Sequence, residues 1–178
     1  MSGYISITCS SALAMIFAVS FISKVRSPAA FGSFVTGLSE MRLVAASVAR
    51  PLAVAVVALE AAVPLLLAVP GWRPAGLALA GGLLTAFTAA IALVLRRQVA
   101  ASCPCFGSST RPVGRRQLLR NVLLVTVVVS GFVTADGQAR LDTGAVAVAV
   151  AVAIVLALAV ILSERLPELT QAADGSRR

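Results

Sequence analysis

The sequence contains no histidine, which removes the side chain that proteins use most often as a metal ligand and as a general base. Charged residues are also scarce, at 12% of the 178 residues, whereas hydrophobic residues make up 59% and the mean hydropathy is +0.97. A soluble globular domain carries about twice that share of charge. The composition therefore excludes a soluble domain and most histidine-based catalytic designs, and it predicts an integral membrane protein.

Aromatic residues are few as well, at 5% of the chain, and this bears on the meaning of the net charge of +8. A nucleic-acid-binding protein of this charge would be expected to carry a basic helix or a platform of stacking aromatic side chains, and neither accompanies the charge. The basic residues lie mostly in connectors between apolar segments, where they orient a membrane protein and contact anionic lipid. We therefore expect membrane lipid as a partner and no nucleic acid.

Cysteine is limited to three residues, and the length and hydrophobicity of the chain exclude a secreted disulfide scaffold. Lys and Arg are absent from the first ten residues, so no cleavable signal peptide is evident and the first apolar segment is expected to stay in the mature protein. Cys9 lies in that segment, and we interpret it as a buried, inert thiol. Cys103 and Cys105 require a different explanation.

Several apolar segments have about the length that a helix needs to cross a bilayer core of about 30 Å. The predicted spans are residues 4–22, 51–69, 75–95, 118–135 and 145–162. The last of these alternates Ala and Val with a period of two, which would indicate a strand in water. In lipid a lone strand would leave its backbone groups unpaired, whereas a helix pairs them internally, so we expect a helix there.

Two details of the first half of the chain are less regular. Residues 27–50 predict either a short interfacial helix, with Phe31 and Phe34 on one face, or a plain loop. Pro51 is expected at the first helical position of the second span, and Pro64 is expected to kink its last turns.

These segments predict an all-α, polytopic membrane helix bundle. Its organisation would be a four-helix membrane domain over residues 1–135, an additional transmembrane helix within 136–162 and a polar tail over 163–178. With five spans, thirteen of the fifteen basic residues fall on one side of the membrane and only Arg73 and Arg140 on the other. By the positive-inside rule, the N-terminus lies outside the bacterial plasma membrane and the loop that carries Cys103 and Cys105 is cytoplasmic.

Reactive chemistry is concentrated in the run Cys103-Pro104-Cys105-Phe106-Gly107, in the arginine-rich connector between the third and fourth spans. Nearby arginines favour the thiolate, which is the form that attacks disulfides. A Cys-x-Cys disulfide closes a small ring and the proline fixes one backbone dihedral, so such a bond would be strained and readily reduced. The motif predicts a dithiol at the membrane surface that takes part in redox or metal exchange.

The alternatives for these thiols are structural or metal-binding roles. A merely structural role is disfavoured, because a connector otherwise rich in Arg, Ser and Gly has no packing role that requires sulfur. A complete zinc site within this chain is not expected, since two thiolates leave two coordination positions without a ligand. Transient binding of a soft metal, or a site shared across a homo-oligomer, stays open. No cofactor is expected.

Glu60 is the second candidate site, because an ionisable group near the middle of a span usually faces the bundle interior with a partner or a proton role. The alternative is a protonated, hydrogen-bonded side chain with a purely structural role. Lys24 and Arg50 are candidate partners, although snorkelling to the interface would also explain both. Asn121, which follows the cysteine motif, is a candidate helix cap or hydrogen-bond partner of the connector. Its neighbour Arg120 is interpreted first as a cytoplasmic anchor.

Taken together, these residues resemble the MauE family of methylamine utilisation proteins, relatives of the DoxX-like membrane proteins. The resemblance covers residues 4–135 and rests on Ser23-Lys24, Phe31, Phe34, Glu60, the motif from Cys103 to Gly107, and Arg120-Asn121. In that family the residue between the two cysteines is commonly glycine, whereas here it is Pro104, which stiffens the turn. The resemblance implies a DoxX-like four-helix core, to which the fifth C-terminal transmembrane helix is an addition.

The resemblance also implies a role in forming or delivering active methylamine dehydrogenase, whose small subunit is exported and rich in disulfides. Cys103 and Cys105 would then be the catalytic residues of a thiol–disulfide oxidoreductase, with a thioredoxin-like protein or an exported enzyme subunit as partner. The supporting residues would be Arg120, Asn121, Glu60 and Lys24. A cytoplasmic dithiol does not reach an exported substrate directly, so it either exchanges electrons with cytoplasmic thiols or lies on the side opposite to the one that the charge count predicts.

Two other classes of function stay open from the sequence. A non-catalytic membrane scaffold or chaperone would use the cysteines to bind a soft metal or to dock a partner. A quinone-linked or small-molecule transporter subunit would require the region around Glu60 to line a cavity.

Overall fold

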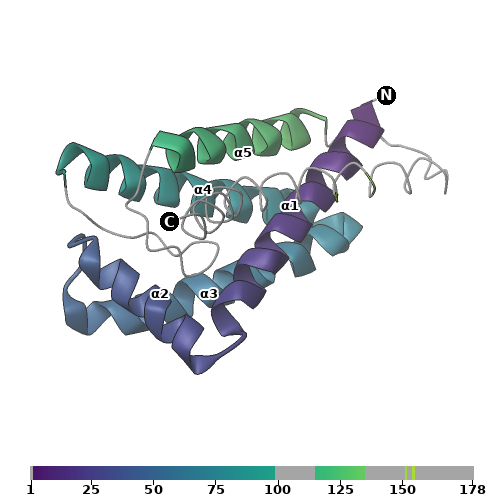
Figure 1. The fold of residues 1–178 in the computed structure, drawn as a ribbon. Helices are drawn as coiled ribbons and strands as arrows, with labels where there is room; N and C mark the ends of the chain where they lie inside the picture. Colours follow the sequence, from purple (N-terminus) through teal and green to yellow (C-terminus); the bar gives the residue numbers. More distant parts are fainter. Residues whose placement is uncertain (1, 99–114, 135–150, 152–153, 155–178) are drawn as a thin grey trace, which may run out of the picture.

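The computed structural model of the chain describes residues 2–98, 115–134, 151 and 154. Regular structure within these residues is entirely helical, which confirms the predicted all-α fold (Figure 1). The α-helices are α1 (Ser2–Val25), α2 (Pro28–Glu40), α3 (Ala46–Ala68), α4 (Arg73–Arg96) and α5 (Arg115–Val133), and a single 3-10 turn, η1 (Pro70–Trp72), joins α3 to α4.

Three of these helices are long and apolar enough to cross a membrane, namely α1, α3 and α4. The apolar part of α5, Gln117–Val133, is shorter and at about 1.5 Å per residue extends over roughly 25 Å. The chain is therefore a multi-pass membrane protein, and the first three predicted spans are confirmed. The segment 145–162, apart from residues 151 and 154, and the tail 163–178 lie outside the described residues.

The four long helices pack as antiparallel neighbours around one apolar core. A Cβ built on Gly81 of α4 would lie 3.2 Å from Val128 of α5, and one on Gly131 of α5 would lie 3.2 Å from Leu77 of α4, so the two helices run in opposite directions. Figure 1 shows α5 alongside α4, with α1 crossing near one end of the pair. The core draws large side chains from all four helices, including Leu13, Phe17, Val63, Leu77, Leu84 and Leu124.

The connector between α1 and α3 contains the helix α2, which decides between the two structures predicted for residues 27–50. Ser27 caps this helix by accepting a hydrogen bond from the Ala30 backbone N–H at 3.1 Å, and Pro28 occupies the first turn, where no N–H is needed. Phe34 points into a small cluster with Ala53 and Val56 of α3. The helix therefore covers the N-terminal half of α3.

Both prolines of α3 lie in the interior of the helix, so the prediction that Pro51 occupies the first helical position was wrong. The helix begins at Ala46, five residues before Pro51, so Pro51 does not open it. Beyond Pro64 the helix continues to Ala68. Pro51 is exposed, so the carbonyl that loses its hydrogen bond there lies near the helix surface, and membrane helices tolerate proline when the freed backbone group finds another partner.

The junction of α3 and α4 is held by a close contact at Gly76. A Cβ at this position would lie 2.8 Å from Leu67 Cδ2 and 3.0 Å from the Leu67 backbone nitrogen. The turn η1 covers Pro70–Trp72, and α4 begins directly after it at Arg73. Trp72 is 60% exposed, which suits a side chain at a membrane interface.

Candidate functional site

A buried ion pair between Lys24 of α1 and Glu60 of α3 is the most polar feature of the bundle interior. The Lys24 Nζ lies 3.0 Å from Glu60 Oε1 and 2.9 Å from Oε2, so the ammonium group donates to both carboxylate oxygens. The two residues are 2% and 1% exposed, respectively. Removing two charges from water costs several kcal/mol for each ion, and only close geometry with additional hydrogen bonds offsets that cost.

Ser20 supplies those additional hydrogen bonds. It lies one helical turn before Lys24, so both side chains project from the same side of α1. The Ser20 hydroxyl accepts a hydrogen bond from Lys24 Nζ at 2.7 Å and donates one to Glu60 Oε1 at 3.1 Å. Three side chains from two helices thus form a closed hydrogen-bonded group, which we call the ion-pair cluster: Ser20, Lys24 and Glu60.

The amphipathic helix α2 covers this cluster from the side of the α1–α3 connector. The Lys24 Nζ lies 5.0 Å from the centroid of the Phe34 ring, within the range of a cation–π contact. Phe34 itself is buried. The ring therefore shields the ammonium group while it contributes a favourable electrostatic contact.

The snorkelling explanation offered for Lys24 is wrong, because its side chain turns inward and is almost fully buried. Arg50, the other candidate partner of Glu60, is exposed in the first turns of α3 and is not in the ion-pair cluster. Lys24 is also the only lysine in the chain, against fourteen arginines. An ammonium group suits this position because it is compact and can direct its three donors to separate acceptors.

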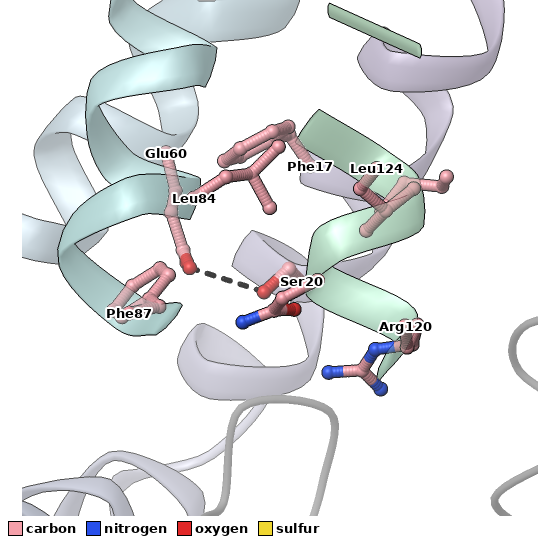
Figure 2. A pocket seen from close by; sticks show the side chains of 9 residues that line it. Phe17, Ser20, Glu60, Leu84, Phe87, Arg120 and Leu124 are labelled. Atoms are coloured by element: carbon pink, nitrogen blue, oxygen red, sulfur yellow. Dashed lines mark hydrogen bonds between the residues drawn. The ribbon is translucent and has the colours of Figure 1, made fainter. Parts of the chain in front are cut away.

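A small cavity of about 20 Å³ opens beside the cluster (Figure 2). Its walls come from α1, α3, α4 and α5, and its lining residues are Ile16, Phe17, Ser20, Glu60, Leu84, Phe87, Arg120, Asn121 and Leu124. Figure 2 shows the Ser20 and Glu60 side chains pointing toward one another on the cavity wall, with Arg120 projecting from α5 on another side. The cavity wall is therefore mostly apolar, and its polar side chains come from α1, α3 and α5.

Arg120 and Asn121 reach this cavity from α5, and their positions differ from those expected. They are the sixth and seventh residues of the helix, so Asn121 is not its cap. Asn121 is 4% exposed and Arg120 is half-buried, both on the cavity wall. Arg120 therefore lines the cavity, while its interpretation as a cytoplasmic anchor stays a prediction. Two polar residues on one turn of an otherwise apolar helix could have suggested, from the sequence, that this turn of α5 faces the bundle interior.

Cys103 and Cys105 lie outside the described residues. The helices on either side end at Arg96 and begin at Arg115, so the motif belongs to the connector between two neighbouring antiparallel helices. We refer to the end of the bundle marked by Arg96 and Arg115 as the connector end. Cys9 is half-buried, which is less than predicted, and it does not line the cavity. Within the described ranges, no group of three His, Cys, Asp or Glu residues could hold a metal ion.

Five of the residues behind the family resemblance are therefore gathered in space. Lys24, Phe34, Glu60, Arg120 and Asn121 come from four helices and all lie at or next to the ion-pair cluster. Sequence reasoning missed Ser20, Phe17 and Phe87, of which only Ser20 carries a signal, its i, i+4 spacing to Lys24.

Among known proteins, a family profile matches most of this chain. No curated protein and no solved structure matches the chain. The profile of the family described as "Methylamine utilisation protein MauE" matches residues 2–134, which is about three-quarters of the chain and includes every described helix. The chain belongs to the MauE family and is a methylamine-utilisation-associated membrane protein.

Proposed function

We propose that this protein carries out thiol–disulfide exchange through Cys103 and Cys105, in support of the maturation or assembly of an exported redox enzyme such as methylamine dehydrogenase. Family membership supports the association with methylamine utilisation. The chemistry of the Cys-Pro-Cys motif among arginines supports the redox step.

One structural observation carries the proposal furthest. Glu60, which pairs with Lys24, lines the same cavity as Arg120 and Asn121. These two residues lie in the first two turns of α5, close to the point where the cysteine-bearing connector joins that helix. A buried polar group of this kind inside a membrane bundle is expensive and usually functional. Its position next to the attachment of the connector supports a role in holding the connector end in one arrangement for the thiols.

The proposed exchange moves electrons only between the thiols and disulfides of two proteins, so it needs no other oxidant or reductant. A thiolate of the Cys103–Cys105 pair attacks a partner disulfide, the partner S–S bond breaks, and a mixed disulfide forms while the released partner thiolate takes up a proton. The second cysteine then attacks the mixed disulfide. The pair ends as a disulfide and the partner as a dithiol, so two electrons have passed to the partner. Run in reverse, the same steps oxidise the partner.

The partner that fits the predicted orientation is a cytoplasmic thioredoxin-like protein. Thirteen basic residues predict that the connector end faces the cytoplasm of the bacterial plasma membrane. An exported enzyme subunit would then be served indirectly, through electron exchange with cytoplasmic thiols.

Trapping of mixed disulfides tests the proposal. In a Cys9→Ser background, we expect either Cys103→Ser or Cys105→Ser to accumulate a reductant-sensitive adduct with one partner protein, because the remaining thiolate attacks and no second thiol resolves the product. The Cys103→Ser/Cys105→Ser double variant should form none, and Cys9→Ser alone should behave as the wild type. If neither single variant forms an adduct and the double variant still supports maturation of the enzyme, the cysteines are not redox-active.

The transporter alternative meets its first requirement, because Glu60 does line a cavity. The volume of about 20 Å³ is nevertheless far below the roughly 300–1,000 Å³ that ligand pockets offer. A non-catalytic scaffold is the outcome that the trapping experiment would favour if no adduct forms.

A further inference from the structure

We infer that the cavity beside the ion-pair cluster is a binding site for one ordered water molecule, which bridges the side-chain amide of Asn121 to the carboxylate of Glu60. This inference concerns α1, α3 and α5 and does not depend on the proposed thiol chemistry.

The first observation is the unmet hydrogen-bonding capacity of Asn121. Its side chain is 4% exposed and lines the cavity, yet no described residue forms a hydrogen bond with its amide. The amide carries two donors and an acceptor. Leaving such a group unsatisfied in the interior costs about 1–3 kcal/mol, so an occupant of the cavity that pairs with it is expected.

The second observation is the remaining capacity of Glu60. Its carboxylate accepts hydrogen bonds from Lys24 on both oxygens and from Ser20 on Oε1. A carboxylate offers about four acceptor sites, so a site remains for one further donor. Glu60 and Asn121 line the same cavity without a direct hydrogen bond between them, which is the arrangement that a bridging molecule completes.

The size and charge of the site select the occupant. A cavity of about 20 Å³ has room for a water molecule, which requires roughly 10–15 Å³. Anions are disfavoured by the Glu60 carboxylate, and cations are disfavoured by Lys24 and Arg120. A small neutral molecule that both donates and accepts is left, and in a membrane protein that molecule is water.

The consequence is a link between α5 and the α1–α3 ion pair. Asn121 acts as a positioning residue, because it holds the water against Glu60, and it lies seven residues into the helix that follows the cysteine connector. Any movement of the first turns of α5 would therefore change the hydrogen bonding of Glu60. In this way the connector end and the buried ion pair would respond to one another.

Asn121 is the only asparagine in the chain, so asparagine labelled with 15N in its side chain gives one side-chain signal in the full-length protein in liposomes. We expect water-edited solid-state NMR to show early magnetisation transfer from water to that NH2 group. Leu124→Phe should fill the cavity and abolish the early transfer, whereas Leu123→Phe, at an exposed position on the same helix, should leave it unchanged. The Cys103→Ser/Cys105→Ser variant should keep the transfer, which separates this test from the proposed function.

Absence of early water transfer in the wild-type protein would overturn the inference, whether or not the Leu124→Phe variant folds. Transfer from lipid acyl protons in place of water would overturn it as well. Equal transfer in the Leu124→Phe and wild-type proteins would place the water elsewhere and also contradict the bridging site.

Discussion

Lys24 and Glu60, thirty-six residues apart in the sequence, form a two-point ion pair inside the helix bundle, with Nζ 3.0 and 2.9 Å from the two carboxylate oxygens. Such a pair is weak evidence for stability, because the desolvation of two charges offsets much of their attraction. Either charge alone would be buried without compensation, so we expect arrangements that separate the two side chains to be disfavoured. The pair therefore fixes α1 against α3 at one relative position.

Breaking this pair should destabilise the protein more than removing it altogether. We expect Lys24→Met and Glu60→Met each to lower the free energy of unfolding by about 3–5 kcal/mol, because each leaves a charged partner buried and unmatched. The Lys24→Met/Glu60→Met double variant should lose less than the sum of the single losses. Reversible unfolding in mixed micelles would measure all three.

Arg50→Met is the matched control for this series, since it removes an exposed cation from the same helix as Glu60 and should change the stability by no more than about 0.5 kcal/mol. Additive losses in the double variant would show that the two side chains are not coupled. If the double variant is stable but no longer supports enzyme maturation, the pair has a functional role beyond packing.

The protection of Lys24 offers a chemical test of the cover provided by α2. As the chain has one lysine, an amine-reactive reagent can modify only Lys24 and the N-terminal amine, and peptide mass spectrometry separates the two. We expect Lys24 to resist modification in the folded protein. Phe34→Ala should accelerate its modification at least tenfold, because loss of the cation–π contact and a buried ring favours local opening by well over about 1.4 kcal/mol.

Phe31→Ala removes a half-buried ring from the same helix and is the matched control for this labelling experiment. Its effect on the modification rate should be small. Rapid modification of Lys24 in the wild-type protein would contradict the buried ion pair.

A glycine comparison tests the packing of α3 on α4. Gly76→Ala should lower the free energy of unfolding by about 1–3 kcal/mol, because the new Cβ would meet both the side chain and the backbone nitrogen of Leu67. Gly82→Ala, on the same helix and with no atom within 4 Å of its Cβ position, should be neutral or stabilise the helix by up to about 1 kcal/mol. Equal effects of the two variants would mean that the Gly76 contact is looser than described.

Thiol labelling in intact cells tests the predicted orientation. In a Cys9→Ser background, a membrane-impermeant maleimide should leave Cys103 and Cys105 unmodified until the cells are permeabilised, because the basic connector is expected to face the cytoplasm. A Gly71→Cys change in a variant that lacks the other cysteines should be labelled in intact cells, since the exposed turn η1 lies one span away on the opposite side. The reverse pattern would invert the topology and would give the dithiol direct access to exported proteins.

Local chemistry made much of the architecture predictable. The spans at α1, α3 and α4 follow from uninterrupted apolar composition, since only a helix of that length satisfies its backbone in lipid. Glu60 was identified for a related reason, because an ionisable group at mid-span usually faces the bundle interior. The start of α3 at Ala46 was missed, because a proline is normally expected in the first turn of a helix. Whether a helix tolerates a proline in its interior depends on whether the surroundings supply a partner for the carbonyl that the proline leaves unpaired.

What the sequence by itself determined was the membrane environment, the helical class and the presence of one ionisable group, Glu60, near the middle of a span. Only the tertiary structure decided that Lys24 supplies this charge, that Ser20 and Phe34 complete its surroundings, and that Arg120 and Asn121 face the cavity beside it. The physical reason is that helical periodicity specifies the face on which a side chain lies, whereas the partner of that face depends on how separate helices pack together in three dimensions.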